Sequence, residues 1–287
     1  MSPVLKVIIT SVLWGTVGIF IREADNMSAV SLAFFRTLIP TVVLFIWLKS
    51  RKAPQKLFRS NWKWMILGSG LNSIRAILFF ISFNLTTIGN AQVTLYSWPI
   101  WAAILGSFFL KEKVSSIQKF LLSIAFLGLL LMFSQSVFSL DDKHFLGICA
   151  MVLSAFILSF VFIVFKKYGT EYQSIEIVFF QNLLTPLLLL PLFIPEAPSL
   201  SLKQVLIASF LGLIIGVLAF SLFFSALKEM KTANAAQITY IEPLCGLLWA
   251  HLLYQESLSP VQIIGAILIL GATFAIPVLR AKEAKKT

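Results

Sequence analysis

Ten apolar runs of about twenty residues each cover most of this 287-residue chain and constrain its fold more than any other feature. A helix rises about 1.5 Å per residue, so each run can cross roughly 30 Å of hydrocarbon. Lipid leaves backbone polar groups no outside partner, and the runs lack the alternation of barrel strands. The sequence therefore predicts an all-α integral membrane protein with ten transmembrane helices. The runs are roughly 4–21, 28–48, 64–84, 90–110, 117–137, 145–165, 174–194, 204–227, 233–254 and 261–279.

The composition excludes several other classes of protein. Hydrophobic residues make up 59% of the chain and charged residues 12%, against about 45–50% and about 25% in soluble domains. Two cysteines in a chain of this length do not form a secreted disulfide scaffold. Ten spans leave only short loops, with no room for a soluble catalytic domain. The sequence also lacks a Gly-x-x-x-x-Gly-Lys loop and a His-Glu-x-x-His zinc motif, so no cofactor and no metal are expected.

The net charge of +11 is distributed unevenly over the two sides of the predicted membrane protein. Of the 23 Lys and Arg residues, 18 fall at the side of the N-terminus, three (Arg22, Lys143 and Lys203) at the other side, and two within spans. Positive loops face the cytoplasm, so we expect both termini to be cytoplasmic in a bacterial-type inner (plasma) membrane. The loop charges also suit anionic lipid headgroups. The lipid bilayer is therefore an expected partner, and nucleic acid is not.

An internal repeat appears when the chain is shifted by 144 residues. Between 90 and 118, seven of 29 positions are identical, where about two or three would match by chance in so biased a composition. Arg22 also overlays Lys166. We expect a first five-helix unit at 1–139 and a second at 140–287. The identical pairs are Asn90/Asn234, Ala91/Ala235, Tyr96/Tyr240, Pro99/Pro243, Glu112/Glu256, Ser115/Ser259 and Gln118/Gln262.

Because five is odd, the second unit must enter the membrane from the opposite side. Inverted repeats of this kind are the common architecture of secondary transporters, with the substrate site at the midplane between the halves. A channel remains an alternative, although it would not need a conformational switch. An intramembrane lipid-modifying enzyme is a second alternative, but it would need a catalytic cluster that the sequence does not display. We therefore expect a transporter and not an enzyme.

Short motifs add a family resemblance over essentially the whole chain. The motifs are Trp14-Gly15, Phe-Phe-Arg at 34–36, Arg75, Pro99 followed by Glu112, and Pro243 followed by Glu256. In this order they resemble the EamA-type members of the drug/metabolite transporter (DMT) superfamily. The resemblance implies a ten-helix carrier of small metabolites, with spans 1–4 and 6–9 around a cavity and spans 5 and 10 at the periphery. It does not name the cargo.

Three charges that a bilayer should exclude break the symmetry of the repeat. Arg36, Arg75 and Glu242 lie near the middle of spans 2, 3 and 9, where the other half has Gln181, Ala219 and Trp98. Each charge costs about 2.5–3.5 kcal/mol at a helix centre, so these side chains must face water or one another. One interpretation is that an Arg holds a substrate carboxylate while Glu242 contacts an amine or passes a coupling proton. The other is an internal salt bridge.

Other polar and aromatic residues fall at the same depth. Asn72 and Phe79 share the helix face of Arg75, and two tryptophans flank Pro99. The predicted substrate-binding residues are Arg36, Asn72, Arg75, Phe79, Tyr96, Trp98, Trp101, Tyr240 and Glu242. Pro99 and Pro243, each in the middle of a predicted helix, are the expected gating hinges because proline removes a backbone hydrogen bond.

Glu112 and Glu256 end their predicted helices on opposite sides of the membrane. A carboxylate at a helix C-terminus opposes the helix dipole, so each is expected to have a basic or backbone partner. For Glu112 the nearest candidates in the sequence are Lys111, Lys113 and Lys119. We expect these glutamates to serve structural closure more than substrate contact.

These features together predict an alternating-access secondary transporter of a small polar molecule. An amino acid or related zwitterion is the first expectation for the small-molecule substrate. A nucleoside-like or S-adenosyl metabolite is the second.

Overall fold

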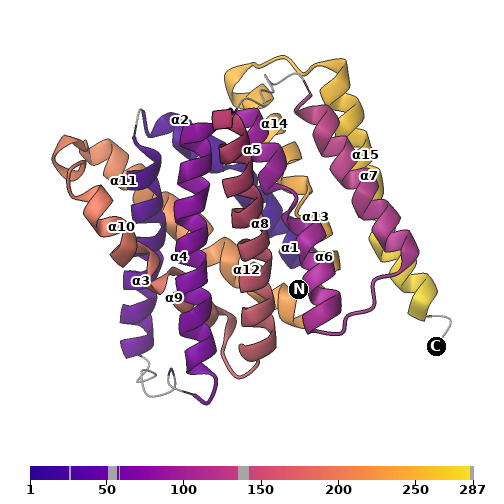
Figure 1. Cartoon of the computed structure of the whole chain (residues 1–287), viewed down its shortest axis with the longest axis horizontal. Coiled ribbons are helices and arrows are strands. Elements are labelled where there is room, and N and C mark those ends of the chain that lie inside the picture. The colour runs from indigo at the N-terminus through magenta and orange to yellow at the C-terminus, as the bar shows by residue number, and fades with distance from the viewer. Residues whose placement is uncertain (26, 51–56, 58, 135–141, 285–287) are drawn as a thin grey trace.

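The structure is a computed structural model that describes residues 1–25, 27–50, 57, 59–134 and 142–284. Its helices form ten membrane segments (Figure 1). The first five segments are α1 (Pro3–Gly15) with α2 (Val17–Glu23), α3 (Ala29–Ser50), α4 (Trp62–Leu85), α5 (Ile88–Leu95) with α6 (Trp98–Phe109), and α7 (Ser116–Met132). The second five are α8 (Asp142–Tyr168), α9 (Ser174–Leu183) with α10 (Thr185–Phe193), α11 (Leu202–Leu211) with the π-helix η3 (Gly212–Ala219) and α12 (Phe220–Glu229), α13 (Thr232–Ile238) with α14 (Ile241–Tyr254), and α15 (Pro260–Ala284).

The predicted ten-helix membrane fold is confirmed. Six segments in the described part of the chain are long and apolar enough to cross a bilayer. Two more are the shorter apolar helices Ser116–Met132 and Pro260–Ala275. The remaining two, α5 with α6 and α13 with α14, are each interrupted near the middle. Their interruption is a property of the site described below.

The duplication seen in the sequence is also the duplication of the structure. Helix α5 begins at Ile88 and α13 at Thr232, an offset of 144 residues, and α7 and α15 begin at Ser116 and Pro260 with the same offset. The two halves differ locally, since η3 is a π-helix where α4 is regular. The expected boundary between the halves, at 139/140, lies outside the described residues.

The two fifth segments pair with each other at one edge of the bundle. Figure 1 shows α7 and α15 side by side, away from α3, α4 and α9. The pairing is close because Gly128 and Gly265 cross, and a Cβ built on Gly265 would lie 2.5 Å from the Gly128 carbonyl oxygen. Their peripheral place agrees with what the family resemblance implied.

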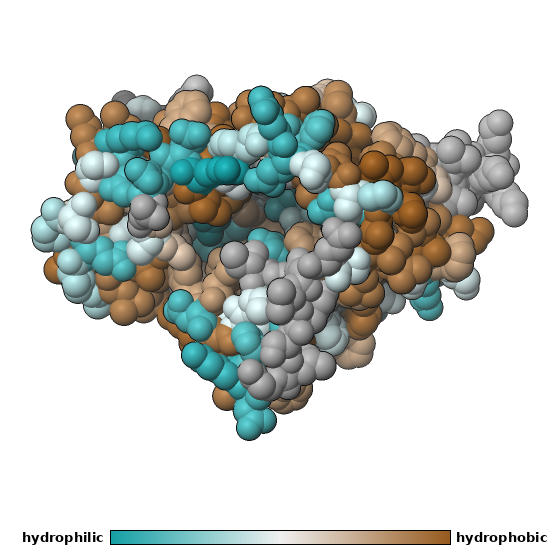
Figure 2. All heavy atoms as spheres, turned by 90° about the horizontal axis from the view of Figure 1, so that it is seen from above, coloured by the Kyte–Doolittle hydropathy of each residue, from teal (hydrophilic) through white to brown (hydrophobic). Residues whose placement is uncertain are grey.

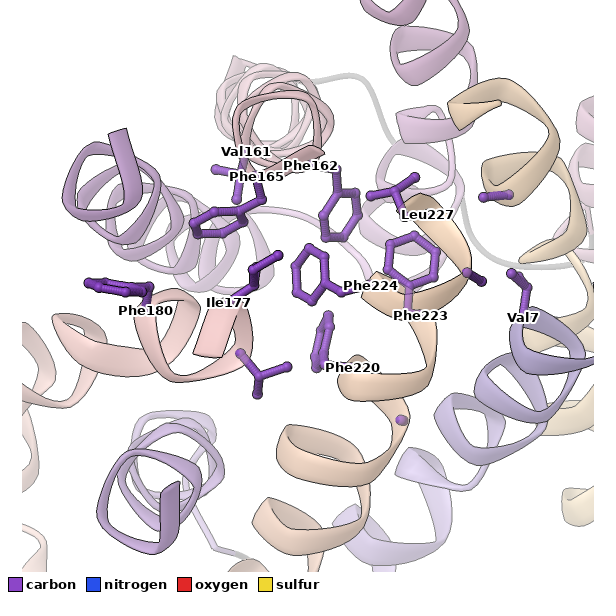
Figure 3. Packing of buried hydrophobic residues seen from close by; sticks show 14 of the residues in the cluster. Val7, Val161, Phe162, Phe165, Ile177, Phe180, Phe220, Phe223, Phe224 and Leu227 are labelled. Atoms are coloured by element: carbon purple, nitrogen blue, oxygen red, sulfur yellow. The ribbon is translucent and has the colours of Figure 1, made fainter. Parts of the chain in front are cut away.

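The main buried core lies at the centre, between α1, α8, α9 and α12. Figure 3 shows the rings of Phe162, Phe220, Phe223 and Phe224 facing one another between α8 and α12. The ring centroids of Phe162 and Phe223 are 4.9 Å apart, within the range of favourable aromatic pairs. Trp14 of α1 joins the cluster 5.2 Å from Phe223. This aromatic cluster closes the interior on one side.

The glycine crossing predicts a position-specific effect of alanine in α15. Gly265→Ala should lower the melting temperature of the detergent-purified protein, because the new methyl group meets backbone atoms and overpacking costs about 1–3 kcal/mol. Gly271→Ala in the same helix is the matched control, because a Cβ there meets nothing within 4 Å. Equal melting temperatures for the two variants would contradict the crossing.

Candidate functional site

Two interrupted helices meet near the middle of the molecule. Helix α5 ends at Leu95 and α6 begins at Trp98, while α13 ends at Ile238 and α14 begins at Ile241. The Tyr240 hydroxyl donates a hydrogen bond of 3.0 Å to the main-chain carbonyl of Tyr96, its counterpart in the other half. A backbone group released by one break is thus satisfied by the other break, as a low-dielectric interior requires.

The two prolines do not lie inside continuous helices, as the sequence suggested. Pro99 occupies the first turn of α6 and Pro243 the first turn of α14, each directly after a break. The first four N–H groups of a helix have no partner within it, so proline costs little there. The chain therefore separates two short helices where a single kinked helix was expected. Their role as hinges stays a prediction.

Glu242 faces the Tyr96 side of the paired breaks. Its carboxylate lies beside the Tyr96 hydroxyl, and the side chain is half-buried in the first turn of α14. A carboxylate in the first turn suits the positive end of the helix dipole. Among the described residues, no basic nitrogen lies within 4.0 Å of this carboxylate. The internal Arg–Glu242 salt bridge, one of the two interpretations left open by the sequence, is thus absent from this conformation.

The two intramembrane arginines lie close together. The guanidinium groups of Arg36 and Arg75 are near enough to repel each other. Arg75 donates from Nε to the Oδ1 of Asn72 at 3.3 Å and lies 6.0 Å from the ring centroid of Phe79. In the described part of the chain, neither guanidinium has a carboxylate within 4.0 Å. The cluster of Arg36, Asn72, Arg75 and Phe79 is therefore a positive group without an internal counter-ion.

The second half of the chain positions this cluster from behind. Asn72 donates from Nδ2 to the carbonyl of Gln181 at 2.9 Å, so the amide that orients Arg75 is fixed to α9. The hydroxyls of Ser73 and Thr185 are 3.0 Å apart, at the start of α10. The sequence analysis treated Gln181 only as the counterpart of Arg36. Its supporting role uses a main-chain carbonyl, which no side-chain pattern reveals.

The two predicted tryptophans lie apart from the arginine cluster in this conformation. Trp98 is buried in the aromatic cluster, with its ring 5.4 Å from Phe162 and 6.4 Å from Phe223. Trp101 packs edge-on against Phe156 of α8 at 5.5 Å. The structure therefore brings seven of the nine predicted residues into two groups around the centre. It assigns Trp98 to the closed side and Trp101 to packing between α6 and α8.

One end of the molecule is hollow. Figure 2 shows this end from above, with hydrophilic residues visible inside a central depression. It is the end at which α2 and α14 finish and α5 begins (Figure 1). A cavity of about 190 Å³ extends from it between α1, α2 and α14, with Gly18, Trp249 and Glu256 among its lining. Arg36, Arg75 and Glu242 are only partly buried although they lie in mid-span, as expected of residues around an internal space.

The opposite end is held shut by ionic contacts. The Glu112 carboxylate accepts from Lys166 Nζ at 2.5 Å and from the backbone N–H of Thr232 at 2.7 Å. The expectation that Lys111, Lys113 or Lys119 would serve Glu112 was wrong, because the partner comes from the other half of the chain. At the hollow end, Glu256 pairs with Arg22 at 2.8 Å. The signal was present in the sequence, since both members of the two pairs are 144 residues apart.

Two further ionic groups reinforce the closed end. Arg59 binds both carboxylate oxygens of Glu176 at 3.0 and 3.1 Å, tying the start of α4 to α9. Lys6 of α1 pairs with Glu229 at the end of α12. The hydroxyl of Tyr172 donates to the carbonyl of Leu57, and burial raises the pKa of that hydroxyl, which keeps it a neutral donor. The closed end is thus bound together by contacts between the two halves.

Comparison with known proteins identifies the architecture. The EamA-like transporter family matches residues 1–134 and again residues 145–277. The chain belongs to the EamA-like transporter family. It is therefore a multi-pass membrane protein and a secondary transporter of the DMT superfamily, with two EamA domains, and not an enzyme. The alternatives of a channel and of an intramembrane enzyme are set aside.

Individual relatives do not agree on a cargo. The chain is 27% identical to the uncharacterized transporter YxxF of Bacillus subtilis over 84% of its own length and 78% of that protein's. It is 21% identical to an S-adenosylmethionine uptake transporter of Rickettsia felis over 96% of this chain and 95% of that one. One solved crystal structure covers 98% of both chains with a TM-score of 0.84 at 17% identity, which supports the fold alone.

The tyrosine contact between the breaks predicts a stability effect. Tyr240→Phe should lower the melting temperature in detergent, because loss of a buried hydrogen bond costs about 0.5–1.5 kcal/mol and leaves the Tyr96 carbonyl without that donor. Tyr254→Phe is the control, because its exposed hydroxyl only reaches Glu23 at 3.3 Å. An equal or larger effect at Tyr254 would contradict the role of the paired breaks.

Proposed function

We propose that this transporter carries a small zwitterionic metabolite, an amino acid or a close derivative. The observation that carries the proposal is the separation of unlike charges around the centre. Arg36 and Arg75 form a positive cluster without a counter-ion, and Glu242 lies apart from them beside Tyr96. A carboxylate of the cargo would bind the guanidinium groups, which suit bidentate contacts, and an ammonium group would bind Glu242.

The remaining predicted residues would shape the space between these charges. Asn72 would hold Arg75 in place, and Phe79, Tyr96 and Tyr240 would supply apolar and hydroxyl contacts. Trp98 and Trp101 would contact cargo only after the aromatic cluster opens, with Pro99 and Pro243 as the hinges. Two nearby arginines repel each other, so an anionic group between them relieves that repulsion on binding.

An S-adenosyl metabolite is the second candidate. The relative named as an S-adenosylmethionine uptake transporter covers nearly the whole chain. Such a cargo carries the same amino and carboxylate groups together with a sulfonium cation, which an aromatic face can accommodate. It would need a larger space than a plain amino acid.

The expected setting is a bacterial-type inner membrane with both termini in the cytoplasm. The loops at the closed end carry most of the Lys and Arg residues, in line with the positive-inside rule. The hollow end would then face outward. A proton on Glu242 is the proposed coupling ion, because a carboxylate in mid-span is the natural site for it.

A ligand screen tests the cargo and the arginine cluster together. Purified protein should melt at a higher temperature with L-amino acids or S-adenosylmethionine, because a ligand of the folded state stabilises it by mass action. Arg75→Gln should weaken binding about ten- to a hundred-fold, the expected loss of a charged hydrogen bond. Lys119→Gln, at an exposed position, is the control.

The same screen distinguishes a carboxylate site from other recognition. Amino-acid amides and decarboxylated amines should bind the wild type weakly and should be insensitive to Arg75→Gln. If Arg75→Gln binds carboxylate and amide ligands as the wild type does, the proposed anion site is wrong.

Proton coupling is tested at Glu242. In proteoliposomes, Glu242→Gln should abolish the dependence of substrate uptake on an imposed pH gradient, because an amide cannot take up and release the proton. Counterflow exchange without a gradient should persist. An equal response of wild type and variant to the gradient would exclude Glu242 as the coupling residue.

A further inference from the structure

We infer that the two ion pairs related by the repeat are alternating latches of the transporter. Lys166–Glu112 stabilises the present conformation by holding one end shut, and Arg22–Glu256 stabilises the reverse conformation by holding the other end shut. The inference concerns positioning residues outside the proposed cargo site. It is independent of which molecule is carried.

The two pairs occupy equivalent places in the inverted halves. Lys166 lies in the last turn of α8, the first segment of the second half, and Glu112 follows α6 of the first half. Arg22 lies in the last turn of α2, in the first segment of the first half, and Glu256 follows α14 of the second half. Each pair therefore joins the first segment of one half to the fourth segment of the other.

The surroundings of the two pairs are unequal. The Lys166 and Glu112 side chains are 15% and 12% exposed, whereas those of Arg22 and Glu256 are both 55% exposed. Lys166 also donates to the carbonyl of Met230 at 2.6 Å, and Glu112 accepts from the N–H of Thr232 at 2.7 Å. The first pair thus clasps the start of α13, and the clasp joins α6, α8 and α13 at the closed end.

The second pair does not clasp its equivalent helix in this conformation. By the 144-residue offset, the counterpart of the start of α13 is the start of α5 at Ile88, and the counterpart of Met230 is Thr86. Arg22 instead stacks 3.8 Å from the ring centroid of Tyr254. An exposed ion pair contributes little by itself. Its free energy would increase when the end closes and the pair becomes buried against α5, with its hydrogen bonds satisfied.

The packing between the first and fourth segments shows where such closure has room. In the closed half, Phe162 of α8 fills the space beside Trp98 and contacts Phe223. The counterpart of Phe162 is Gly18, which lines the cavity of about 190 Å³ between α1, α2 and α14. A Cβ on Gly18 would meet nothing within 4 Å. The hollow end therefore has space into which α4 and α5 can move.

Reporter cysteines at repeat-related positions test the latches. Ile19→Cys lines the open cavity and Ile163→Cys is 1% exposed at the closed end. Each is placed in a background with Cys149→Ala and Cys245→Ala and reacted with a water-soluble maleimide in detergent micelles. Both ends are then open to reagent, so the orientation in the membrane does not matter. The wild type should react fast at the first reporter and slowly at the second.

The two latch variants should move the reporters in opposite directions. Glu112→Gln should raise the rate at the Ile163→Cys reporter and lower the rate at the Ile19→Cys reporter, changing their ratio about ten-fold, since hydrogen bonds to a charged group are lost in one conformation only. Glu256→Gln should lower the rate at the Ile163→Cys reporter about ten-fold, because that rate follows the population of the reverse conformation. Combining both changes should return the ratio toward the wild-type value.

The control is Glu171→Gln, which neutralises an exposed carboxylate at the closed end. It should leave both rates unchanged. Shifts in the same direction for Glu112→Gln and Glu256→Gln, or none, would overturn the inference and leave two static braces. If Glu112→Gln fails to fold by gel filtration, Glu256→Gln decides alone, because its exposed pair is not part of the closed end. An unchanged rate at the Ile163→Cys reporter in that variant would overturn the inference as well.

Discussion

The absence of water from the bilayer interior is the constraint on which the rest of the structure depends. An interrupted helix exposes backbone groups that lipid cannot satisfy. The inverted repeat removes this cost, because each interrupted segment lies next to the other and the Tyr240 hydroxyl donates to the Tyr96 carbonyl. The same pairing places Glu242 beside the Tyr96 hydroxyl. The polar centre of the transporter is thus a direct consequence of duplication, and a single half could not provide it.

Function resides where the two halves differ. Arg75 stands where the second half has Ala219, Glu242 where the first half has Trp98, and Gly18 where the second half has Phe162. The first two differences place charge around the centre, and the third leaves one end less filled than the other. The shared positions, by contrast, set the breaks and the latch pairs. An asymmetric cargo is therefore recognised by a symmetric frame that carries unlike side chains.

The fold could be predicted from the sequence because span length and the repeat are properties of long segments. Offsets of 144 residues in the sequence became offsets of 144 residues in the helix starts. The contacts could not be predicted in the same way. Lysines near Glu112 in the sequence were the obvious partners, yet a helix that ends points its carboxylate toward the other half and Lys166. The prolines likewise marked each break without revealing that the helix stops two residues earlier.

The unequal packing of the two ends has an energetic consequence for transport. Closing an end removes apolar surface from the water that fills the hollow, and burial of one phenylalanine is worth about 1.5–3 kcal/mol. The closed end contains Phe162, whereas the hollow end has only Gly18 to offer. The empty protein therefore favours the present conformation. To reverse it, cargo must supply free energy, and neutralising Arg36 and Arg75 is one source, because two unpaired guanidinium groups resist enclosure more than an ion pair does.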